Sequence, residues 1–305
     1  MEYVLTTQGL CKHYGRFKAL DSLSMHVPKG SIYGFVGRNG AGKTTLIRLI
    51  CGLQQPSSGS YTLYGAKSSN GHTLSTVRRR MGAVVETPSI YLDLSAADNL
   101  KQQYRVLGRP SDDGIPELLS LVGLEDTGRK KARHFSLGMR QRLGIAVALA
   151  GEPDFLVLDE PVNGLDPQGI IEMRELILKL NQERGITVLI SSHILDELAR
   201  LATHYGFIDS GRMVKELSAQ ELDAACRKCL RVTVSDPGAL ARVLDGMGVE
   251  YQILDRDQAD LFAQVNLSQL ALALAAEDCE LISAQERDES LESYFIDLVG
   301  GGQHA

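Results

Sequence analysis

An eight-residue segment, Gly37-Arg38-Asn39-Gly40-Ala41-Gly42-Lys43-Thr44, matches the pattern G-x-x-x-x-G-K-[ST] at every defined position. The apolar run from Ser31 to Val36 precedes it and predicts a strand, and the run from Thr45 to Ile50 follows it and predicts a helix. A glycine-rich loop in this context is typical of proteins that hold nucleotide phosphates. The sequence therefore predicts a nucleoside triphosphate site here, rather than a glycine-rich turn without a ligand.

Each part of this loop has a chemical role in the prediction. Glycines let backbone N–H groups approach phosphate oxygens with no Cβ in the way. The helix start adds partial positive charge, and Lys43 adds a full charge that we expect to take part in catalysis. The Thr44 hydroxyl is expected to bind Mg2+ and Thr45 to reach a phosphate. All residues from Gly37 to Thr45 are thus predicted to bind the nucleotide.

A second apolar run ends in two carboxylates, at Phe155-Leu156-Val157-Leu158-Asp159-Glu160. Such a run is typical of a buried strand in a parallel sheet, and ligands bind at the carboxyl ends of these strands. Asp159 is expected to hold Mg2+ through water, and Glu160 to act as the general base that orients water. The alternative is a solvated turn before Pro161, but a phosphate-binding loop needs an acid for its metal.

A third motif lies between these two, at Phe135-Ser136-Leu137-Gly138-Met139-Arg140-Gln141-Arg142. Ser136 can cap the following helix, and Gly138 lets the backbone approach a ligand. In this order along the chain, the motif resembles the signature L-S-G-G-Q of the ATP-binding cassette (ABC) family. Leu137 replaces the first glycine and Met139 the glutamine, which leaves a backbone and hydroxyl contact to phosphate possible.

The resemblance covers residues 1 to about 217 and implies roles for three further residues. Tyr14 matches the aromatic that stacks on adenine, although a single aromatic can also belong to the core. Asp166, in Asn163-Gly164-Leu165-Asp166, matches the D-loop, which crosses the dimer interface in the family. His193 matches the switch histidine that contacts the γ-phosphate, although a lone His at a strand end can be structural. The resemblance implies ATP and Mg2+ as ligands and ATP hydrolysis as the reaction.

Glu86, in Glu86-Thr87-Pro88, stands where the family has a glutamine that contacts Mg2+ and the attacking water. Because carboxylates are hard oxygen ligands, we expect Glu86 to bind Mg2+ and to take part in catalysis. The alternative is a solvated loop carboxylate. With the altered signature and the C-terminal region, this segment is similar to the bacitracin- and lantibiotic-type subgroup of ATP-binding subunits.

The family resemblance also implies two protein partners. One chain carries one phosphate loop and one signature, so Ser136 to Met139 of one copy are expected to face the phosphate loop of a second copy in a two-fold homodimer. A separate transmembrane permease subunit is expected to hold the protein at the cytoplasmic face of the cell membrane. The expected docking surface runs from Glu86 to Leu100 and includes Tyr91 and Leu92. The subgroup suggests export of, or resistance to, an antimicrobial peptide or drug.

A soluble ABC ATPase that acts on the ribosome or on DNA is the alternative from a different class. The translation-factor branch joins two cassettes through a basic linker, whereas this chain has one cassette. The DNA-repair branch inserts coiled coils into its cassette, and no heptad run interrupts residues 40 to 160. A formal net charge of −6 over 305 residues also argues against stable nucleic-acid binding. Co-purification with a membrane fraction would separate the two classes.

The remaining composition fits a cytoplasmic protein. No apolar stretch reaches the roughly 18 residues that a membrane span needs, and residues 1–8 lack the pattern of a secretory signal. The 5 cysteines have no regular spacing, so no disulfide framework is expected. Cys226 and Cys229 form a C-x-x-C, but the second pair that a zinc site needs does not follow.

The predicted fold class is α/β: a P-loop NTPase cassette over residues 1–217, followed by a small C-terminal α+β domain. The cassette is expected to have a mainly parallel core sheet, an antiparallel edge sheet from residues 1–30 and 59–66, and a helical signature subdomain over about 95–150. A linker is expected at 218–229. A β-α-β-β-α-β pattern over 230–299 then includes a strand at Leu261–Val265 and a last helix at Ser290–Val299, before a disordered tail at 300–305.

Overall fold

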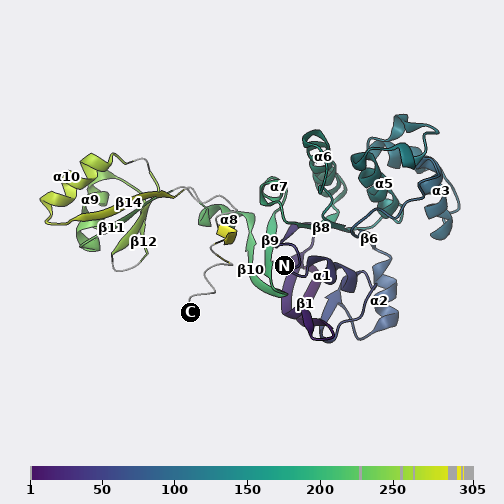
Figure 1. The fold of residues 1–305 in the computed structure, drawn as a ribbon, viewed down its shortest axis with the longest axis horizontal. Helices are drawn as coiled ribbons and strands as arrows, with labels where there is room; N and C mark the ends of the chain where they lie inside the picture. Colours follow the sequence, from purple (N-terminus) through teal and green to yellow (C-terminus); the bar gives the residue numbers. More distant parts are fainter. Residues whose placement is uncertain are drawn as a thin grey trace. The chain divides into compact units, whose positions relative to one another are not determined.

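The computed structural model describes residues 2–226, 229–254, 257–263, 265–287, 294–296 and 298. The chain divides into two compact units, Met1–Ala219 and Gln220–Ala305 (Figure 1). Each unit has its own hydrophobic core. Most of the predicted last helix, and all of the predicted tail at 300–305, lie outside the described residues.

A six-stranded sheet forms the centre of the first unit, in the order β10-β9-β3-β8-β7-β6. All neighbours are parallel except the hairpin of β9 and β10. Strands β3, β7 and β8 are buried along their whole length, which explains their continuous apolar runs. The mainly parallel core sheet was predicted and is confirmed. The strands are β3 (Ile32–Val36), β6 (Met81–Val84), β7 (Phe155–Asp159), β8 (Thr187–Ser192), β9 (His204–Asp209) and β10 (Arg212–Ser218).

A second, antiparallel sheet has the order β2-β1-β4-β5, as expected for the edge sheet. Its strands are β1 (Tyr3–Tyr14), β2 (Phe17–Pro28), β4 (Ser58–Leu63) and β5 (Ala66–Lys67). Strands β1 and β2 form a hairpin in which Tyr14 lies directly opposite Phe17. Buried and exposed residues alternate over much of β2, because only one face of this sheet packs on the core.

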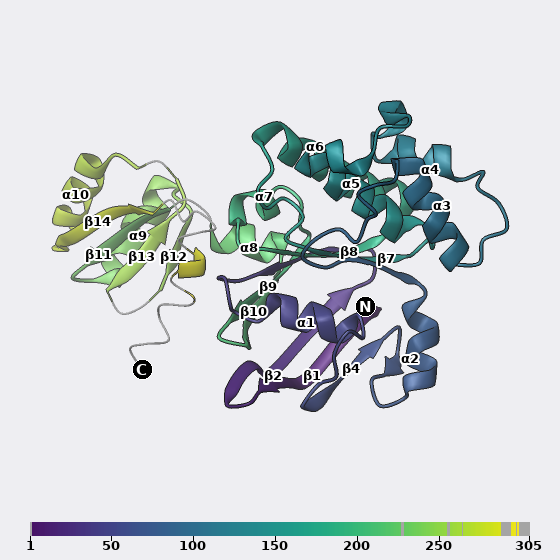
Figure 2. The same cartoon turned by 45° about the vertical axis from the view of Figure 1, so that its right-hand side comes forward.

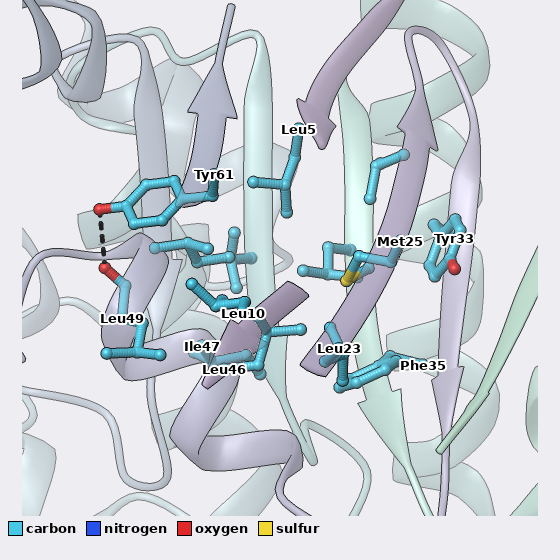
Figure 3. Packing of buried hydrophobic residues seen from close by; sticks show 14 of the residues in the cluster. Leu5, Leu10, Leu23, Met25, Tyr33, Phe35, Leu46, Ile47, Leu49 and Tyr61 are labelled. Atoms are coloured by element: carbon cyan, nitrogen blue, oxygen red, sulfur yellow. Dashed lines mark hydrogen bonds between the residues drawn. The ribbon is translucent and has the colours of Figure 1, made fainter. Parts of the chain in front are cut away.

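Helix α1 (Lys43–Ile50) packs between the two sheets and begins at the end of the phosphate loop. Figure 3 shows its side chains among those of the antiparallel sheet and of β3. The buried residues drawn there include Leu46, Ile47 and Leu49 of α1, Leu10, Leu23 and Tyr61 of the sheet, and Phe35 of β3. The Tyr61 hydroxyl donates to the Leu49 carbonyl oxygen at 3.1 Å. This packing fixes the helix that begins at the end of the glycine-rich loop.

The expected helical subdomain is present, with α3, α4 and α5 side by side (Figure 2). The helices of the first unit are α1, α2 (Gly71–Arg78), α3 (Ala96–Val106), α4 (Ile115–Leu121), α5 (Leu137–Leu149), α6 (Pro167–Arg184) and α7 (Leu195–Ala199). Short 3-10 turns at Glu125–Thr127 and Ala132–His134 connect α4 to α5. Among the described residues, no helix combines the length and apolar character that crossing a bilayer would require.

The second unit is a four-stranded antiparallel sheet with α9 and α10 packed on one face. Its elements are α8 (Ala219–Ala225), β11 (Cys229–Val234), α9 (Pro237–Met247), β12 (Tyr251–Ile253), β13 (Gln258–Leu261), α10 (Leu267–Ala276) and β14 (Leu281–Arg287).

Two sequence predictions differ from this structure. The third strand of the second unit lies at Gln258–Leu261 instead of Leu261–Val265, and helix α8 lies in the segment expected to be a linker. The charged residue Asp260 interrupts the apolar pattern that would indicate a strand there. In the structure, its carboxylate accepts two hydrogen bonds from Arg231 on β11, at 2.6 and 2.7 Å. Helix α8 was not predicted because Leu222 is the one buried residue of this helix, so its sequence has no apolar stripe at helical spacing.

Candidate active site

A cleft of about 290 Å³ opens at the carboxyl ends of β3 and β7. Tyr14, Phe17 and Ala19 of the β1–β2 hairpin line one end of it. Asn39 and Gly40 of the phosphate loop and the residues from Gly42 to Thr45 line the middle, and Glu160 and Asn163 complete the wall. The fold thus brings together three segments that the sequence analysis assigned to nucleotide chemistry on separate grounds.

The phosphate loop takes a backbone path that requires glycine. Gly42 has a φ of 112°, and a Cβ there would lie 2.6 Å from the Ala19 carbonyl oxygen. A Cβ on Gly37 would lie 2.6 Å from the Ile208 side chain. Among the described residues, no side chain caps the N-terminus of α1. Its first N–H groups and its dipole are therefore available to an anion in the cleft.

Lys43 is buried at the start of α1 and is held by the loop that it follows. Its Nζ donates to the Gly37 carbonyl oxygen at 2.6 Å and to the Arg38 carbonyl oxygen at 3.3 Å. The same Nζ lies 3.1 Å from Glu160 Oε1. The ammonium group is thus positioned between the phosphate loop and the end of β7, where a terminal phosphate would lie.

Glu160 follows β7 in a left-handed conformation, with a φ of 51°. Its backbone N–H donates to the Ser191 carbonyl oxygen at 3.2 Å and to Ser191 Oγ at 3.0 Å. Its Oε2 lies 2.7 Å from His193 Nδ1. One carboxylate therefore contacts both the lysine of the phosphate loop and the histidine beyond β8. A non-glycine residue with a strained backbone, held by hydrogen bonds at its N–H and by contacts at its side chain, is typical of a functional site.

Asp159 ends β7 and is almost completely buried, with 1 % of its surface exposed. Ser191 Oγ donates to its Oδ1 at 2.6 Å, whereas Oδ2 is buried and has no hydrogen-bond partner among the described residues. A buried carboxylate oxygen without a donor is costly unless a further ligand satisfies it. A hydrated Mg2+ would do so, because carboxylates and threonine hydroxyls such as that of Thr44 are hard oxygen ligands. The residues present therefore fit this ion.

Tyr14 stands at the far end of the cleft, on the last residue of β1. Its hydroxyl donates to Gln54 Oε1, and Lys12 Nζ lies 5.3 Å from the centre of its ring. Lys12 Nζ in turn donates to the Gln55 carbonyl oxygen at 2.7 Å. These contacts hold an exposed aromatic ring at the border of the cleft, where it can contact a base.

Comparison with known proteins gives one consistent result. The family model for ABC transporters matches residues 20–163. A bacitracin transport ATP-binding protein of Enterococcus faecalis is 38% identical over 99% of this chain and 98% of its own length. A lantibiotic transport ATP-binding protein of Streptococcus pyogenes is 43% identical over 70% of this chain and 90% of its own length. A daunorubicin resistance ATP-binding protein of Streptomyces coeruleorubidus is 33% identical over 97% and 96%.

The chain belongs to the ABC transporter family. Solved structures agree on the fold: an ATP-binding cassette of an ABC transporter in its ADP conformation has a TM-score of 0.66 and 26% identity, over 74% of this chain and 94% of its own. A dimeric cassette in a post-hydrolysis state with ADP and Pi has a TM-score of 0.63 and 23% identity, over 70% and 98%. The chain is thus an ATP-binding, ATP-hydrolysing cassette subunit.

In this ABC cassette, the signature residues lie at the start of α5. Ser136 caps the helix by accepting a hydrogen bond from the Met139 N–H at 3.2 Å. Leu137 packs over the D-loop, since a Cβ on Gly164 would lie 3.2 Å from its side chain. Ser136 to Met139 do not border the chain's own cleft in its described part. Their contact with a second copy's nucleotide stays a prediction.

Asp166, which the sequence analysis assigned to the D-loop, caps a helix of its own chain. Its Oδ1 accepts a hydrogen bond from the Gly169 N–H at 3.0 Å and caps α6. Asn163, three residues earlier, borders the cleft. The D-loop therefore adjoins the nucleotide site, and a role for Asp166 across an interface stays a prediction.

Glu86 lies outside the residues that line the cleft. Its side chain is 54% exposed, and its Oε1 lies 2.5 Å from Arg48 Nη2 on α1. Like Glu160, it has a left-handed backbone, with a φ of 58°. The structure thus joins Glu86 to the helix of the phosphate loop, and the predicted catalytic and Mg2+ roles of Glu86 stay predictions.

Four residues of the site were not among the predicted ones. They are Phe17, Ala19, Asn163 and Ser191. Ser191 lies near the end of β8, two residues before His193. Its closeness in sequence to the predicted His193 is the feature from which it could have been predicted. Phe17 and Ala19 could be found only through the register of the β1–β2 hairpin, which places Phe17 opposite Tyr14.

The expected docking segment is an ordered loop between β6 and α3. The buried Asn99 amide accepts from the Tyr91 N–H at 2.7 Å and donates to the Tyr91 carbonyl oxygen at 3.0 Å. The N–H of Ala132 donates to the Leu94 carbonyl oxygen at 2.9 Å. The side chains of Tyr91 and Leu92 remain exposed, at 61% and 47%. A fixed backbone thus presents two exposed apolar side chains.

Proposed function

We propose that this chain binds ATP together with Mg2+ in the cleft, hydrolyses it there, and powers a separate transmembrane permease. The single observation that carries the proposal is that the Glu160 carboxylate contacts both Lys43 and His193, and follows in sequence Asp159, whose buried Oδ2 has no hydrogen-bond partner among the described residues. A cation, a base and a metal-binding acid around one point are what phosphoryl transfer to water requires.

Each residue has a defined part in the proposed reaction. The loop from Gly37 to Thr45, of which Asn39, Gly40 and Gly42 to Thr45 line the cleft, holds the phosphates, and Tyr14 contacts the adenine. Thr44 and Asp159 would hold Mg2+, which supplies charge neutralisation at the phosphate oxygens when bound. Glu160 accepts a proton from the attacking water, and Lys43 stabilises charge on the terminal phosphate. His193, hydrogen-bonded to Glu160 at 2.7 Å, orients that carboxylate and reaches the same phosphate.

We further propose that the working unit is a homodimer with two composite sites. The cleft of one chain supplies the phosphate loop and Glu160, and the signature residues Ser136 to Met139 come from the second copy. Support comes from the exposed position of Leu137, from a cleft that Ser136 does not border, and from a fold shared with a dimeric cassette. Loss of the terminal phosphate would then separate the two copies.

The partner and the substrate follow from the relatives. Their names connect them with bacitracin transport, lantibiotic transport and daunorubicin resistance. By this likeness the chain serves export of, or resistance to, an antimicrobial peptide or drug. It sits at the cytoplasmic face of the membrane, bound to the permease through the loop that carries Tyr91 and Leu92. Residues 1–217 form the nucleotide-binding domain, because the whole cleft lies in the first unit.

Phosphate release by the purified full chain tests the proposal. Glu160→Gln keeps the size of the side chain but removes the base, so kcat should fall at least about hundredfold while ATP affinity stays within a few fold. Val106→Ala is the matched control, because Val106 is 78% exposed and lies outside the cleft. Hydrolysis by Glu160→Gln at a rate near that of the parent would contradict the assigned base.

A further inference from the structure

Two aromatic rings border the base end of the cleft, and only one of them, Tyr14, is explained so far. Phe17 is the first residue of β2 and pairs directly with Tyr14 across the hairpin turn. Side chains of directly opposed residues in an antiparallel pair point to the same face of the sheet. Both residues also line the cleft. Phe17 and Tyr14 are therefore a cross-strand pair of aromatic residues that both line the cleft.

The wall that begins at this pair continues to the phosphate loop. Ala19, two residues beyond Phe17 on β2, also lines the cleft. The Ala19 carbonyl oxygen lies 2.6 Å from the position of a Cβ on Gly42, so the wall ends at the start of α1. A nucleotide whose phosphates lie on that loop has its base along this wall, with small Ala19 beside the sugar and the larger rings beyond it.

Phe17 has the exposure expected of a side chain that contacts a ligand. It is 61% exposed, which is unusual for a phenylalanine that borders a concave site. The Tyr14 hydroxyl is engaged by Gln54, and Ala19 and Phe17 carry no hydrogen-bonding side chain. The side chains of these three hairpin residues therefore offer ring faces and apolar surface to a base. None of the three has a free hydrogen-bonding side-chain group that could distinguish the edge of one base from that of another.

We infer that Phe17 is a second base-contacting residue, and that the Tyr14–Phe17 pair binds purine nucleoside triphosphates by stacking and apolar contact. The inference rests on the proposed function, because it assumes that the cleft binds ATP. Every base has a π face, so recognition of this kind tolerates a change of base. Adenine and guanine nucleotides are both substrates of this site, and the triphosphate end supplies the affinity that they share.

Calorimetric titration of the full chain in the Glu160→Gln background tests the inference without hydrolysis. The ligands are ATP, GTP and tripolyphosphate, each with Mg2+, and tripolyphosphate has no base. The variants are Phe17→Ala and Phe17→Leu, with Val106→Ala as the control for removal of an exposed apolar side chain. Phe17→Ala should weaken ATP and GTP about tenfold each, or about 1.4 kcal/mol, and leave tripolyphosphate within about twofold. Phe17→Leu, which keeps apolar bulk but no ring, should fall between.

Three results would overturn the inference. The first is an ATP affinity of Phe17→Ala within about twofold of its parent, and the second is an equal loss for ATP and tripolyphosphate. The third is a parent that prefers ATP over GTP by more than about a hundredfold, since that requires reading of the base edge. A parent that binds no ATP at all would instead refute the proposed function itself, so the two failures are distinguishable.

Discussion

At the scale of single residues, the acidic end of the site depends on a serine that no motif names. Ser191 Oγ donates to Asp159 Oδ1 at 2.6 Å and accepts from the Glu160 N–H at 3.0 Å. One buried hydroxyl therefore fixes the metal-binding carboxylate and the backbone of the proposed base together. It also leaves Asp159 Oδ2 as the buried oxygen that has no hydrogen-bond partner among the described residues and that a ligand would satisfy.

Replacing Ser191 by alanine should impair both stability and catalysis. The change leaves Asp159 Oδ1 and the Glu160 N–H each without one partner, so unfolding in urea should require about 1–3 kcal/mol less free energy. The rate of phosphate release should fall at least about tenfold, and half-maximal activity should need a higher Mg2+ concentration. Both are measured on the purified variant at fixed ATP.

Ser192→Ala is the matched control for this variant. Ser192 is equally buried, but its hydroxyl contacts the backbone of Ile194 instead of the acidic pair. Ser192→Ala should lower stability without changing the Mg2+ requirement. The same Mg2+ dependence in Ser191→Ala and the parent would show that Ser191 does not position the carboxylate.

A second prediction at this scale concerns Cys51, the residue that follows α1. Burial raises the pKa of its thiol to about 12, while Arg78 lowers it and Asp159 raises it to smaller extents. At pH 8 the thiolate fraction is then about one in ten thousand, against roughly a quarter for an ordinary thiol of pKa near 8.5. Iodoacetamide at pH 8 should therefore leave Cys51 unmodified in the folded protein and modify it in urea, as read by peptide mass spectrometry.

The sign of the associated stability change follows from the same shift. The pKa of Cys51 is higher in the folded state, so its contribution to stability is fully present below about pH 8 and is lost as the pH rises toward 12. Cys51 is partly buried, and its alkylation in the folded protein at the rate of a free thiol would contradict the raised pKa of this thiol.

At the scale of elements, the loop between β6 and α3 connects the cassette to its proposed partner. The Asn99 amide fixes the backbone at Tyr91, while the Tyr91 ring stays 61% exposed. Because the ring makes little contact within the chain, Tyr91→Ala should fold with an unchanged melting temperature. In a host strain that lacks the gene, it should restore the antimicrobial resistance that was lost with the gene no better than Glu160→Gln does.

The outcomes of that complementation separate two proposals. Full resistance with Tyr91→Ala would contradict the docking surface. Unaltered sensitivity of the strain that lacks the gene to antimicrobial peptides and drugs would contradict the proposed substrate class and leave the docking surface to be tested by co-sedimentation with host membranes.

Most elements of the cassette could be predicted because their sequence signals are local. The glycines of the phosphate loop, the continuous apolar runs of β7 and β8, and the cap pair of Pro167 and Gly185 on α6 each act within a few residues. The strand at Gln258–Leu261 was misplaced, because its charged Asp260 is satisfied by Arg231 on another strand. Such a partner is visible only once the sheet has formed.

The same distinction holds for the candidate site. Lys43, Asp159 and Glu160 could be predicted since each belongs to a motif with its own strand or helix. Phe17 and Ser191 depend on strand register, and the position of Glu86 depends on Arg48 from a helix 38 positions away in sequence. Pairings of this kind are set by tertiary packing, so single-sequence patterns do not contain them.

At the scale of the whole molecule, the chain consists of two compact units. The first holds the complete cleft, and the second has a separate core between one sheet and two helices. The signature residues do not border the chain's own cleft in the described structure, although they belong to the same unit. The central claim is therefore that two copies complete each other's sites around ATP.

Light scattering after size exclusion tests this claim most directly, on Glu160→Gln with and without ATP and Mg2+. Glu160→Gln should bind ATP without hydrolysing it, so we predict a monomer without nucleotide and a dimer with ATP. Ser136→Glu in the same background should stay monomeric, because a carboxylate at the cap would repel the partner's phosphates. A Glu160→Gln species whose mass does not change when ATP is added would contradict the composite site.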